Sequence, residues 1–204
     1  MKIYKTYLLI LIITFSSNIF AQKTVKMKCE FGTKNRELLD ILYFEDIDIE
    51  TLTFESEEIK NKYFEINLNE YYKGKLVNSK QLFEGSESEY FKIDSSFTSF
   101  KFFAKMENLD LKTYIQGKGF GSRKETFKLK KGHGEYVLKD FQGSKKQLNV
   151  PLNEEFPILA IITATIHEDG SGSYCEVAQS DVPPEEYGEK FKIPHYFIIT
   201  MKFK

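Results

Sequence analysis

The chain has 204 residues, of which 41% are hydrophobic and 29% charged, with a formal net charge of −1. This balance argues against nucleic acid or an anionic membrane as the partner, because both attract proteins with a basic excess. Phe, Tyr, Ile and Leu occur throughout, which excludes a disordered chain. The abundance of Ile, Asn and Phe, with Lys at nearly every basic position, is typical of an AT-rich bacterial genome.

The N-terminal segment has the three parts of a secretory signal peptide. Lys2 and Lys5 form a basic start, residues 7–15 carry an apolar run, and Ala21 offers a small residue for cleavage. The apolar run is far shorter than the ~20 residues that a membrane span needs. We predict that residues 1–21 are removed and that the protein is exported to the periplasm or the extracellular space, with no membrane span afterwards. A retained N-terminal anchor is the alternative.

Two cysteines remain after this segment, Cys29 and Cys175. An exported protein can form and keep a disulfide. Apolar and polar residues alternate around both cysteines, and this places Cys29 on the side of Met27 and Cys175 on the side of Val177. Both thiols are therefore expected to face a core. A disulfide between them and two buried free thiols remain equally open.

Two short helical segments are expected. Asn35 can cap a helix of about two turns that extends to Leu42. The segment 183–188 begins with proline and ends with glycine, which is typical of a single helical turn.

Most of the chain alternates between apolar and polar residues with a period of two. Alternation of this kind is typical of antiparallel sheets with one face in a core and the other in water. Lys73-Gly74 and residues 168–172 are typical hairpin turns. Residues 157–166 are almost entirely apolar and predict a strand buried on both faces. The clearest alternating segments are residues 64–68, 100–106, 109–111, 126–130 and 197–203.

We therefore predict an all-β fold, a mainly antiparallel β-sandwich of about ten strands with one or two short helical turns. No repeat or Pro/Ser-rich linker divides residues 22–204, so a single domain is the simplest interpretation. The alternative is two small β domains that meet near residues 86–88.

Asp46, Asp48 and Glu50 alternate with two isoleucines, so their carboxylates would share one strand face. Calcium needs several converging oxygen ligands, and these three residues are the candidates for a metal site. A strand face holds such groups ~6–7 Å apart, so a further loop would have to complete the site. We favour a stripe that faces water and keep the calcium site as the alternative.

The motifs of common enzymes are missing from the sequence. The histidines at 133, 167 and 195 lack the spacing of zinc ligands and are expected at the surface. Residues 117–121 are rich in glycine but precede a strand-like segment, so they do not form a phosphate loop at a helix N-terminus. No nucleophile elbow is found. Paired carboxylates of a glycosidase stay open, because such pairing depends on the fold.

Charge is distributed unevenly along the chain. Residues 32–70 contain eleven acidic and four basic residues, whereas residues 112–146 contain ten basic and three acidic residues. Two oppositely charged surfaces would favour the docking of a charged partner. The solvated faces of individual strands would produce the same pattern.

These features lead us to expect an exported, non-enzymatic protein without a cofactor that binds another protein or associates with the envelope. The alternative is a glycan-binding module or a carbohydrate-active protein. Such proteins need exposed aromatic platforms, and tyrosine would have to provide them because the chain has no Trp. The candidate tyrosines, which could equally be ordinary sheet residues, are Tyr71, Tyr72, Tyr174 and Tyr196.

Overall fold

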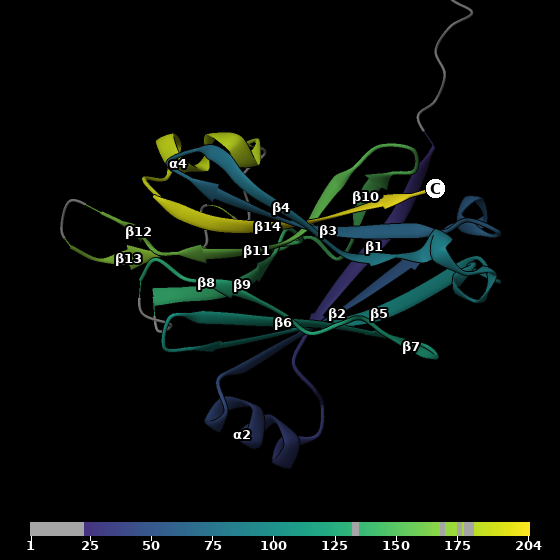
Figure 1. Ribbon diagram of the computed structural model, residues 1–204, viewed down its shortest axis with the longest axis horizontal. Coiled ribbons are helices and arrows are strands. Elements are labelled where there is room, and N and C mark those ends of the chain that lie inside the picture. The colour runs from purple at the N-terminus through teal and green to yellow at the C-terminus, as the bar shows by residue number, and fades with distance from the viewer. Residues whose placement is uncertain (1–22, 132–134, 168–169, 175–176, 178–181) are drawn as a thin grey trace, which may run out of the picture.

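The computed structural model describes residues 23–131, 135–167, 170–174, 177 and 182–204. The predicted signal peptide therefore lies outside the described residues. Two antiparallel sheets form the body of the molecule (Figure 1). The predicted all-β sandwich is confirmed. The described residues form fourteen strands, whereas about ten were expected. Several strands, such as β7 and β13, are only two residues long and too short to show alternation.

The larger sheet has the strand order β10-β1-β2-β5-β6-β7, with β8 paired to the side of β6. Its inward side chains alternate along each strand, as the sequence predicts. Its strands are β1 (Thr24–Phe31), β2 (Ile47–Glu55), β5 (Phe97–Glu107), β6 (Asp110–Gly117), β7 (Phe120–Gly121), β8 (Glu125–Lys128) and β10 (Leu148–Pro151).

The smaller sheet has the order β4-β3-β14-β11-β9. A separate hairpin pairs β12 (Thr165–Ile166) with β13 (Gly172–Ser173), at the predicted turn 168–172, of which residues 168–169 lie outside the described part. The strands of the smaller sheet are β3 (Phe64–Tyr72), β4 (Lys75–Glu84), β9 (Tyr136–Asp140), β11 (Phe156–Thr163) and β14 (His195–Phe203).

Short helices connect the strands. The predicted helix at Asn35–Leu42 is confirmed as α2 (Arg36–Phe44), and the Asn35 side chain accepts a hydrogen bond from the Leu38 backbone N–H at its start. Within the described residues, no helix is long and apolar enough to cross a membrane. The remaining helices are η2 (Glu57–Ile59), η3 (Gly85–Glu87), η4 (Glu89–Phe91), η6 (Pro184–Glu186) and α4 (Tyr187–Lys190).

Phenylalanines from both sheets fill the space between them. Phe54 of the larger sheet contacts Phe203 of the smaller sheet edge to face, with ring centroids 5.6 Å apart. Phe100 stacks on Phe54 and on Phe64 of the opposite sheet, each at 5.7 Å. Aromatic pairs of this kind add to the apolar burial that stabilises the core. A single buried cluster thus joins the two sheets.

A second apolar cluster lies on the outer face of the smaller sheet. There η6 and α4 cover the sheet, as Figure 1 shows above β14. Ala160 and Ile162 of β11 are buried by this cover, whereas Leu159 and Ile161 face the main core. The prediction of a strand buried on both faces is therefore confirmed, although β11 ends at Thr163.

The turn at Lys73-Gly74 is confirmed, with both residues at positive φ, as a tight hairpin requires. The helical turn predicted at 183–188 continues to Lys190, so the expectation that Gly188 ends it was wrong. A Cβ atom on Gly188 would lie 2.6 Å from the backbone nitrogen of Gly74. Glycine at 188 therefore allows the helix to approach the hairpin closely.

Replacing Phe54 with alanine is expected to lower the free energy of unfolding by about 3–5 kcal/mol, because a cavity would remain between the sheets. Chemical denaturation measures the loss. Phe97→Ala removes the same ring from an exposed position of the larger sheet and should change stability by only about 0.5 kcal/mol. Equal losses for the two variants would contradict this description of the core.

Candidate functional site

Helix α2 projects from the larger sheet on the side away from the smaller sheet (Figure 1). Leu42 is its buried residue, yet four other apolar side chains of the helix are exposed. Ile41 is 59% exposed and Phe44 is 85% exposed. Because successive residues are ~100° apart on a helix, apolar residues extend well beyond the buried face. We call the exposed group the α2 surface: Leu38, Ile41, Tyr43 and Phe44.

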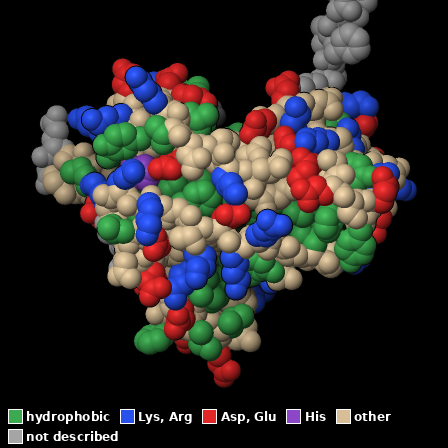
Figure 2. All heavy atoms as spheres, in the orientation of Figure 1, with side chains coloured by type: hydrophobic (Ala, Val, Ile, Leu, Met, Phe, Trp, Pro, Cys, Tyr) green, Lys and Arg blue, Asp and Glu red, His purple; other side chains and the backbone are tan. Residues whose placement is uncertain are grey.

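Acidic side chains accompany this apolar surface. Figure 2 shows hydrophobic and acidic side chains together at the lower tip of the molecule, where α2 lies in Figure 1. Glu37 lies in the first turn of the helix, and Asp40 pairs with Arg36 on the helix itself. Glu45, just after the helix, pairs with Lys105 of β5. The predicted acidic segment 32–70 therefore contains a projecting apolar helix.

A pocket of about 230 Å³ lies at the base of α2, between the helix and strands β2, β5 and β9. The lining residues with polar side-chain atoms are Tyr43, Asp46, Asp48 and Tyr136. We call it the α2 pocket, and its eight lining residues are Leu42, Tyr43, Asp46, Ile47, Asp48, Met106, Tyr136 and Val137.

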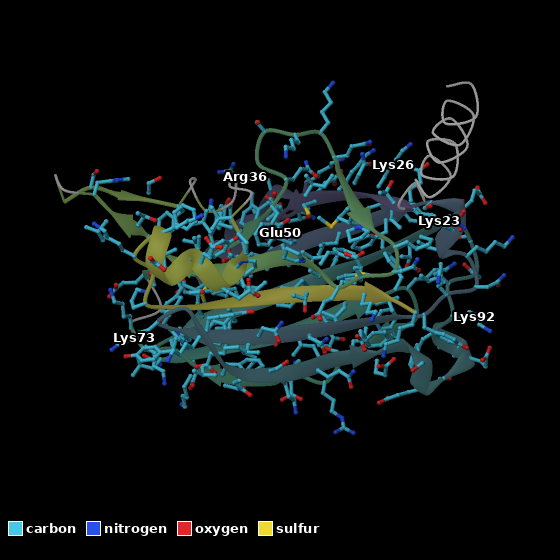
Figure 3. The ribbon with its side chains drawn as sticks, turned by 90° about the horizontal axis from the view of Figure 1, so that it is seen from above. Lys23, Lys26, Arg36, Glu50, Lys73 and Lys92 are labelled. Atoms are coloured by element: carbon cyan, nitrogen blue, oxygen red, sulfur yellow. The ribbon has the colours of Figure 1, made fainter. Side chains whose placement is uncertain are left out.

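The three predicted metal ligands lie in three different environments. Asp46 is exposed in the turn before β2, Asp48 is half-buried in the α2 pocket, and Glu50 is only 2% exposed. Figure 3 shows Glu50 in the middle of the molecule, whereas the labelled lysines lie around its periphery. In the described part of the chain, no three His, Cys, Asp or Glu side chains are grouped to hold a metal ion.

The expected water-facing stripe was therefore wrong for Glu50. Asp48 and Glu50 do share a strand face, but it is the face of the buried Leu52 and Phe54, turned toward the smaller sheet. The opposite face of β2 is also covered, because α2 packs against this strand and Ile49 is buried.

Burial changes the protonation of these carboxyls. Desolvation, followed by the negative charges of Asp140 and Asp48, raises the pKa of Glu50 to about 8. Glu50 is therefore mostly protonated at pH 7, and its Oε2 atom has no hydrogen-bond partner among the described residues. Desolvation also raises the pKa of Asp48, although a hydrogen bond with the Leu138 backbone acts to lower it.

Cys29 borders the same acidic region. Burial raises the pKa of its thiol, and the charges of Asp140 and Glu50 add to the effect. A thiol held in the neutral form is a poor nucleophile. Cys29 is half-buried and forms no disulfide with any described residue. Cys175 lies outside the described residues, so the disulfide stays a prediction.

A buried hydrogen-bond chain joins Glu70, His195 and Tyr136 on the inner face of the smaller sheet. The Nε2 atom of His195 lies 3.0 Å from Glu70 Oε1, and Nδ1 lies 2.6 Å from the Tyr136 hydroxyl. Desolvation lowers the pKa of His195. Because a carboxylate only accepts hydrogen bonds, a neutral His195 donates from Nε2 to Glu70 and accepts the Tyr136 proton at Nδ1.

The expected surface position of His195 was wrong, since this residue is only 1% exposed. The alternation of β14 carried the signal, because His195 has the same parity as the inward Phe197 and Ile199. Both ring nitrogens of His195 are occupied by protein groups, which leaves neither for a substrate or a metal. Of the other two histidines, His167 is half-buried and His133 lies outside the described residues.

The four candidate tyrosines do not form one exposed row. Tyr71 and Tyr196 are buried and stack on each other, with centroids 5.0 Å apart. The Tyr196 hydroxyl donates to the Pro184 carbonyl at 2.6 Å, so this pair helps to hold the C-terminal helices on the sheet. Tyr72 is exposed, and Tyr174 is half-buried. The expectation of a platform therefore fails for Tyr71 and Tyr196.

A second hollow, of about 590 Å³, lies at another part of the molecule, around η4, the start of β5 and the β6–β7 turn. Two of its aromatic side chains, Tyr90 and Phe97, are exposed. We call it the aromatic cleft, lined by Phe64, Tyr90, Phe91, Lys92, Ile93, Asp94, Ser95, Phe97, Thr98, Ser99, Lys118, Gly119 and Phe120.

The glycine-rich segment 117–121 forms one wall of the aromatic cleft and joins two strands, as predicted. A Cβ atom on Gly117 would overlap the ring of Phe120, and one on Gly119 would overlap the hydroxyl of Tyr90. These glycines therefore let aromatic rings lie directly on the backbone. The glycines were visible in the sequence, but the aromatic rings that leave no room for a Cβ atom at these positions were not predicted.

Comparison with models of known protein families, with curated proteins and with solved structures finds no match for this chain. The chemistry of the site therefore rests on its own residues. The α2 pocket is lined from both β2, which carries Asp48 and Glu50, and β9, which carries Tyr136.

Glu50→Gln is expected to make the protein more stable at pH 8 than the unchanged chain. Below pH 4.5, the ordinary value for Glu, both folded and unfolded chains hold the proton. Between pH 4.5 and pH 8 the unfolded chain loses the Glu50 proton while the folded chain keeps it. The free energy of unfolding therefore falls by up to about 1.4 kcal/mol per pH unit. Above the folded pKa the loss is constant.

Denaturation series from pH 4 to 9 measure this dependence for Glu50→Gln and for Glu30→Gln, an exposed glutamate of the neighbouring strand. Between about pH 5 and pH 8 the free energy of unfolding of the Glu50 variant should fall less than that of the unchanged chain. The Glu30 variant should show the same fall as the unchanged chain. Parallel curves for all three proteins would show that Glu50 does not hold its proton in the fold.

Proposed function

We propose that this protein is exported and binds another protein through the α2 surface, without catalysing a reaction. The observation that carries the proposal is the excess of exposed apolar residues on a projecting helix. Covering the larger sheet requires the buried face of α2, but not Ile41 or Phe44. Exposed apolar groups gathered on one element are typical of protein interaction sites.

The charges around α2 indicate the character of the partner. Acidic residues lie beside the apolar side chains, two of them paired with Arg36 and Lys105, so a complementary surface would have an apolar centre and basic groups at its rim. Export is supported by the residues of the N-terminal segment, Lys2, Lys5, the apolar run and Ala21. An inhibitor or an accessory subunit of an envelope complex fits this description.

Ile41→Asp is expected to lower the affinity for the captured partner by about tenfold or more, because a charge would enter the apolar centre of the interface. The purified protein first captures partners from envelope and secreted fractions of the source organism, identified by mass spectrometry. Titration with the leading partner then gives the affinity of each variant.

Ile166→Asp is the matched control, because Ile166 is also 59% exposed but lies on the β12–β13 hairpin. It should leave the affinity unchanged. Equal affinity of the Ile41 variant and the unchanged protein would refute binding through α2. Equal losses for both variants would point to a non-specific effect of the added charge.

The aromatic cleft favours a second candidate function, the binding of a glycan. Exposed Tyr90 and Phe97 offer ring faces on which a sugar can pack, and Asp94, Ser95 and Ser99 offer hydrogen-bonding groups beside them. The volume of the cleft lies within the range of small-ligand sites. This cleft, and not the four tyrosines of the sequence analysis, is the place where such binding would occur.

A glycan array probed with the purified protein tests this second candidate. If a glycan binds, Tyr90→Ala and Phe97→Ala should each weaken binding about tenfold, because each removes one stacking face. Tyr43→Ala removes a comparably exposed ring from α2 and should have no effect. A glycan bound equally well by all variants would place its site elsewhere, and an empty array would exclude this function for the sugars tested.

A further inference from the structure

The side chains that line the α2 pocket are suited to one kind of ligand. Its only charged groups are the carboxyls of Asp46 and Asp48, and none of its eight lining residues is Lys, Arg or His. Tyr43 and Tyr136 contribute aromatic rings, which also attract cations. The aliphatic side chains of the wall come from Leu42, Ile47 and Met106, since the Val137 side chain packs into the second apolar cluster. Acidic and aromatic groups above an aliphatic wall favour a cation on a short hydrocarbon chain.

The buried hydrogen-bond chain strengthens this preference. Tyr43 and Tyr136 are the two lining residues with a hydroxyl, and the hydroxyl proton of Tyr136 is committed to His195 at 2.6 Å. Glu70 accepts a hydrogen bond from Nε2 of His195. Nδ1 is therefore the ring nitrogen that accepts the Tyr136 proton. Tyr136 therefore offers the pocket its ring and no hydrogen-bond donor. A ligand that must receive hydrogen bonds, such as a carboxylate, would find no partner in this side chain.

The nearest lysines do not fill the pocket. Lys105 is ion-paired with Glu45 at 2.9 Å and approaches Glu107 at 3.8 Å. Neither Lys105 nor Lys139 is among the residues that line the pocket. The wall therefore presents carboxyls and no cationic side chain of the protein itself. A cation that enters from outside would be attracted to these carboxyls.

We propose that the α2 pocket binds a primary alkylammonium group, and that in the complex it receives a lysine side chain of the partner protein. The methylene groups of the lysine would lie against Leu42, Ile47 and Met106, and its ammonium would lie beside Asp46 and Asp48. Lysine has four methylene groups and a compact charge, which suits a pocket of about 230 Å³. The second part of this inference rests on the proposed function, and the first part does not.

Methionine-methyl NMR of the purified protein, titrated with n-butylammonium chloride, tests the pocket without any partner. The chain has four methionines; Met27, Met106 and Met201 belong to the core cluster, and of these three only Met106 also lines the pocket. The Met106 signal should shift and saturate at millimolar probe, the weak binding expected of so small a ligand. Met106→Leu identifies the signal. Sodium butyrate and n-butanol, at equal ionic strength, should not reproduce the shift.

Asp48→Asn should weaken the binding of butylammonium about tenfold, because it removes the half-buried carboxyl but keeps the shape. Asp94→Asn removes an acidic side chain from the distant aromatic cleft and should leave binding unchanged. Ile47→Phe, which enlarges an aliphatic side chain of the pocket wall and keeps both carboxyls, should also abolish the shift, and it serves if Asp48→Asn fails to fold. An absent shift, an equal shift with n-butanol, or full binding by Asp48→Asn would overturn the proposal.

The lysine step is tested separately with the captured partner. Asp48→Asn should lower the affinity for the partner, as Ile41→Asp does. If butylammonium binds but Asp48→Asn leaves the affinity for the partner unchanged, the lysine step is wrong while the pocket stands. If butylammonium binds but Ile41→Asp has no effect on the partner, the proposed function fails while the pocket stands.

Discussion

The sandwich interior is not apolar throughout, and this constraint shapes the molecule. Where the inner faces meet near Phe54, Phe100 and Phe203, they bury a continuous apolar cluster. Beyond this core, the same faces carry Asp48 and Glu50 on one sheet and the Glu70–His195–Tyr136 chain on the other. Burying such groups costs free energy unless each one is paired or neutral.

The molecule reduces this cost in two ways. Glu50 becomes neutral by holding its proton, and His195 stays neutral between two partners. Neither arrangement improves on a well-packed apolar residue, so stability alone does not explain them. Buried titratable groups with altered pKa values tend to gather at functional sites, and these groups lie behind the α2 pocket. Tyr136 links them to it, since it lines the pocket and hydrogen-bonds to His195.

The polar interior and the apolar exterior meet at α2. Its buried residue Leu42 lines the pocket, whereas Ile41 and Phe44 face solvent. A partner that covers the exposed apolar side chains would therefore reach the carboxyl of Asp48 in the same contact. Apolar area would supply affinity, and the charge would supply specificity for a basic side chain.

The local sequence was enough to predict the sheets from alternation, the hairpin at Lys73-Gly74 from its turn residues, and helix α2 from its capping residue Asn35. It was not enough to decide which face of β2 turns inward. Ile47 and Ile49 lie on one face and Leu52 and Phe54 on the other, so both faces contain apolar residues. The choice depends on α2, which packs on the outer face and lets Glu50 turn inward.

Other features were settled by contacts between distant parts of the chain. Tyr71 and Tyr196 are buried because η6 and α4 cover them, and Gly188 is required by the hairpin more than a hundred residues earlier. No local pattern carries this information. The inward position of His195 is different, because the parity of β14 already indicated it.

Hydrogen–deuterium exchange of the protein, alone and in complex with its captured partner, tests the central claim most directly, because one experiment compares every described surface. Interaction at the α2 end predicts slower exchange on binding at residues 36–48 and 136–140, with little change at the aromatic cleft. Protection confined to the cleft segments 89–99 and 117–121, or to the edge strand β4, would contradict it.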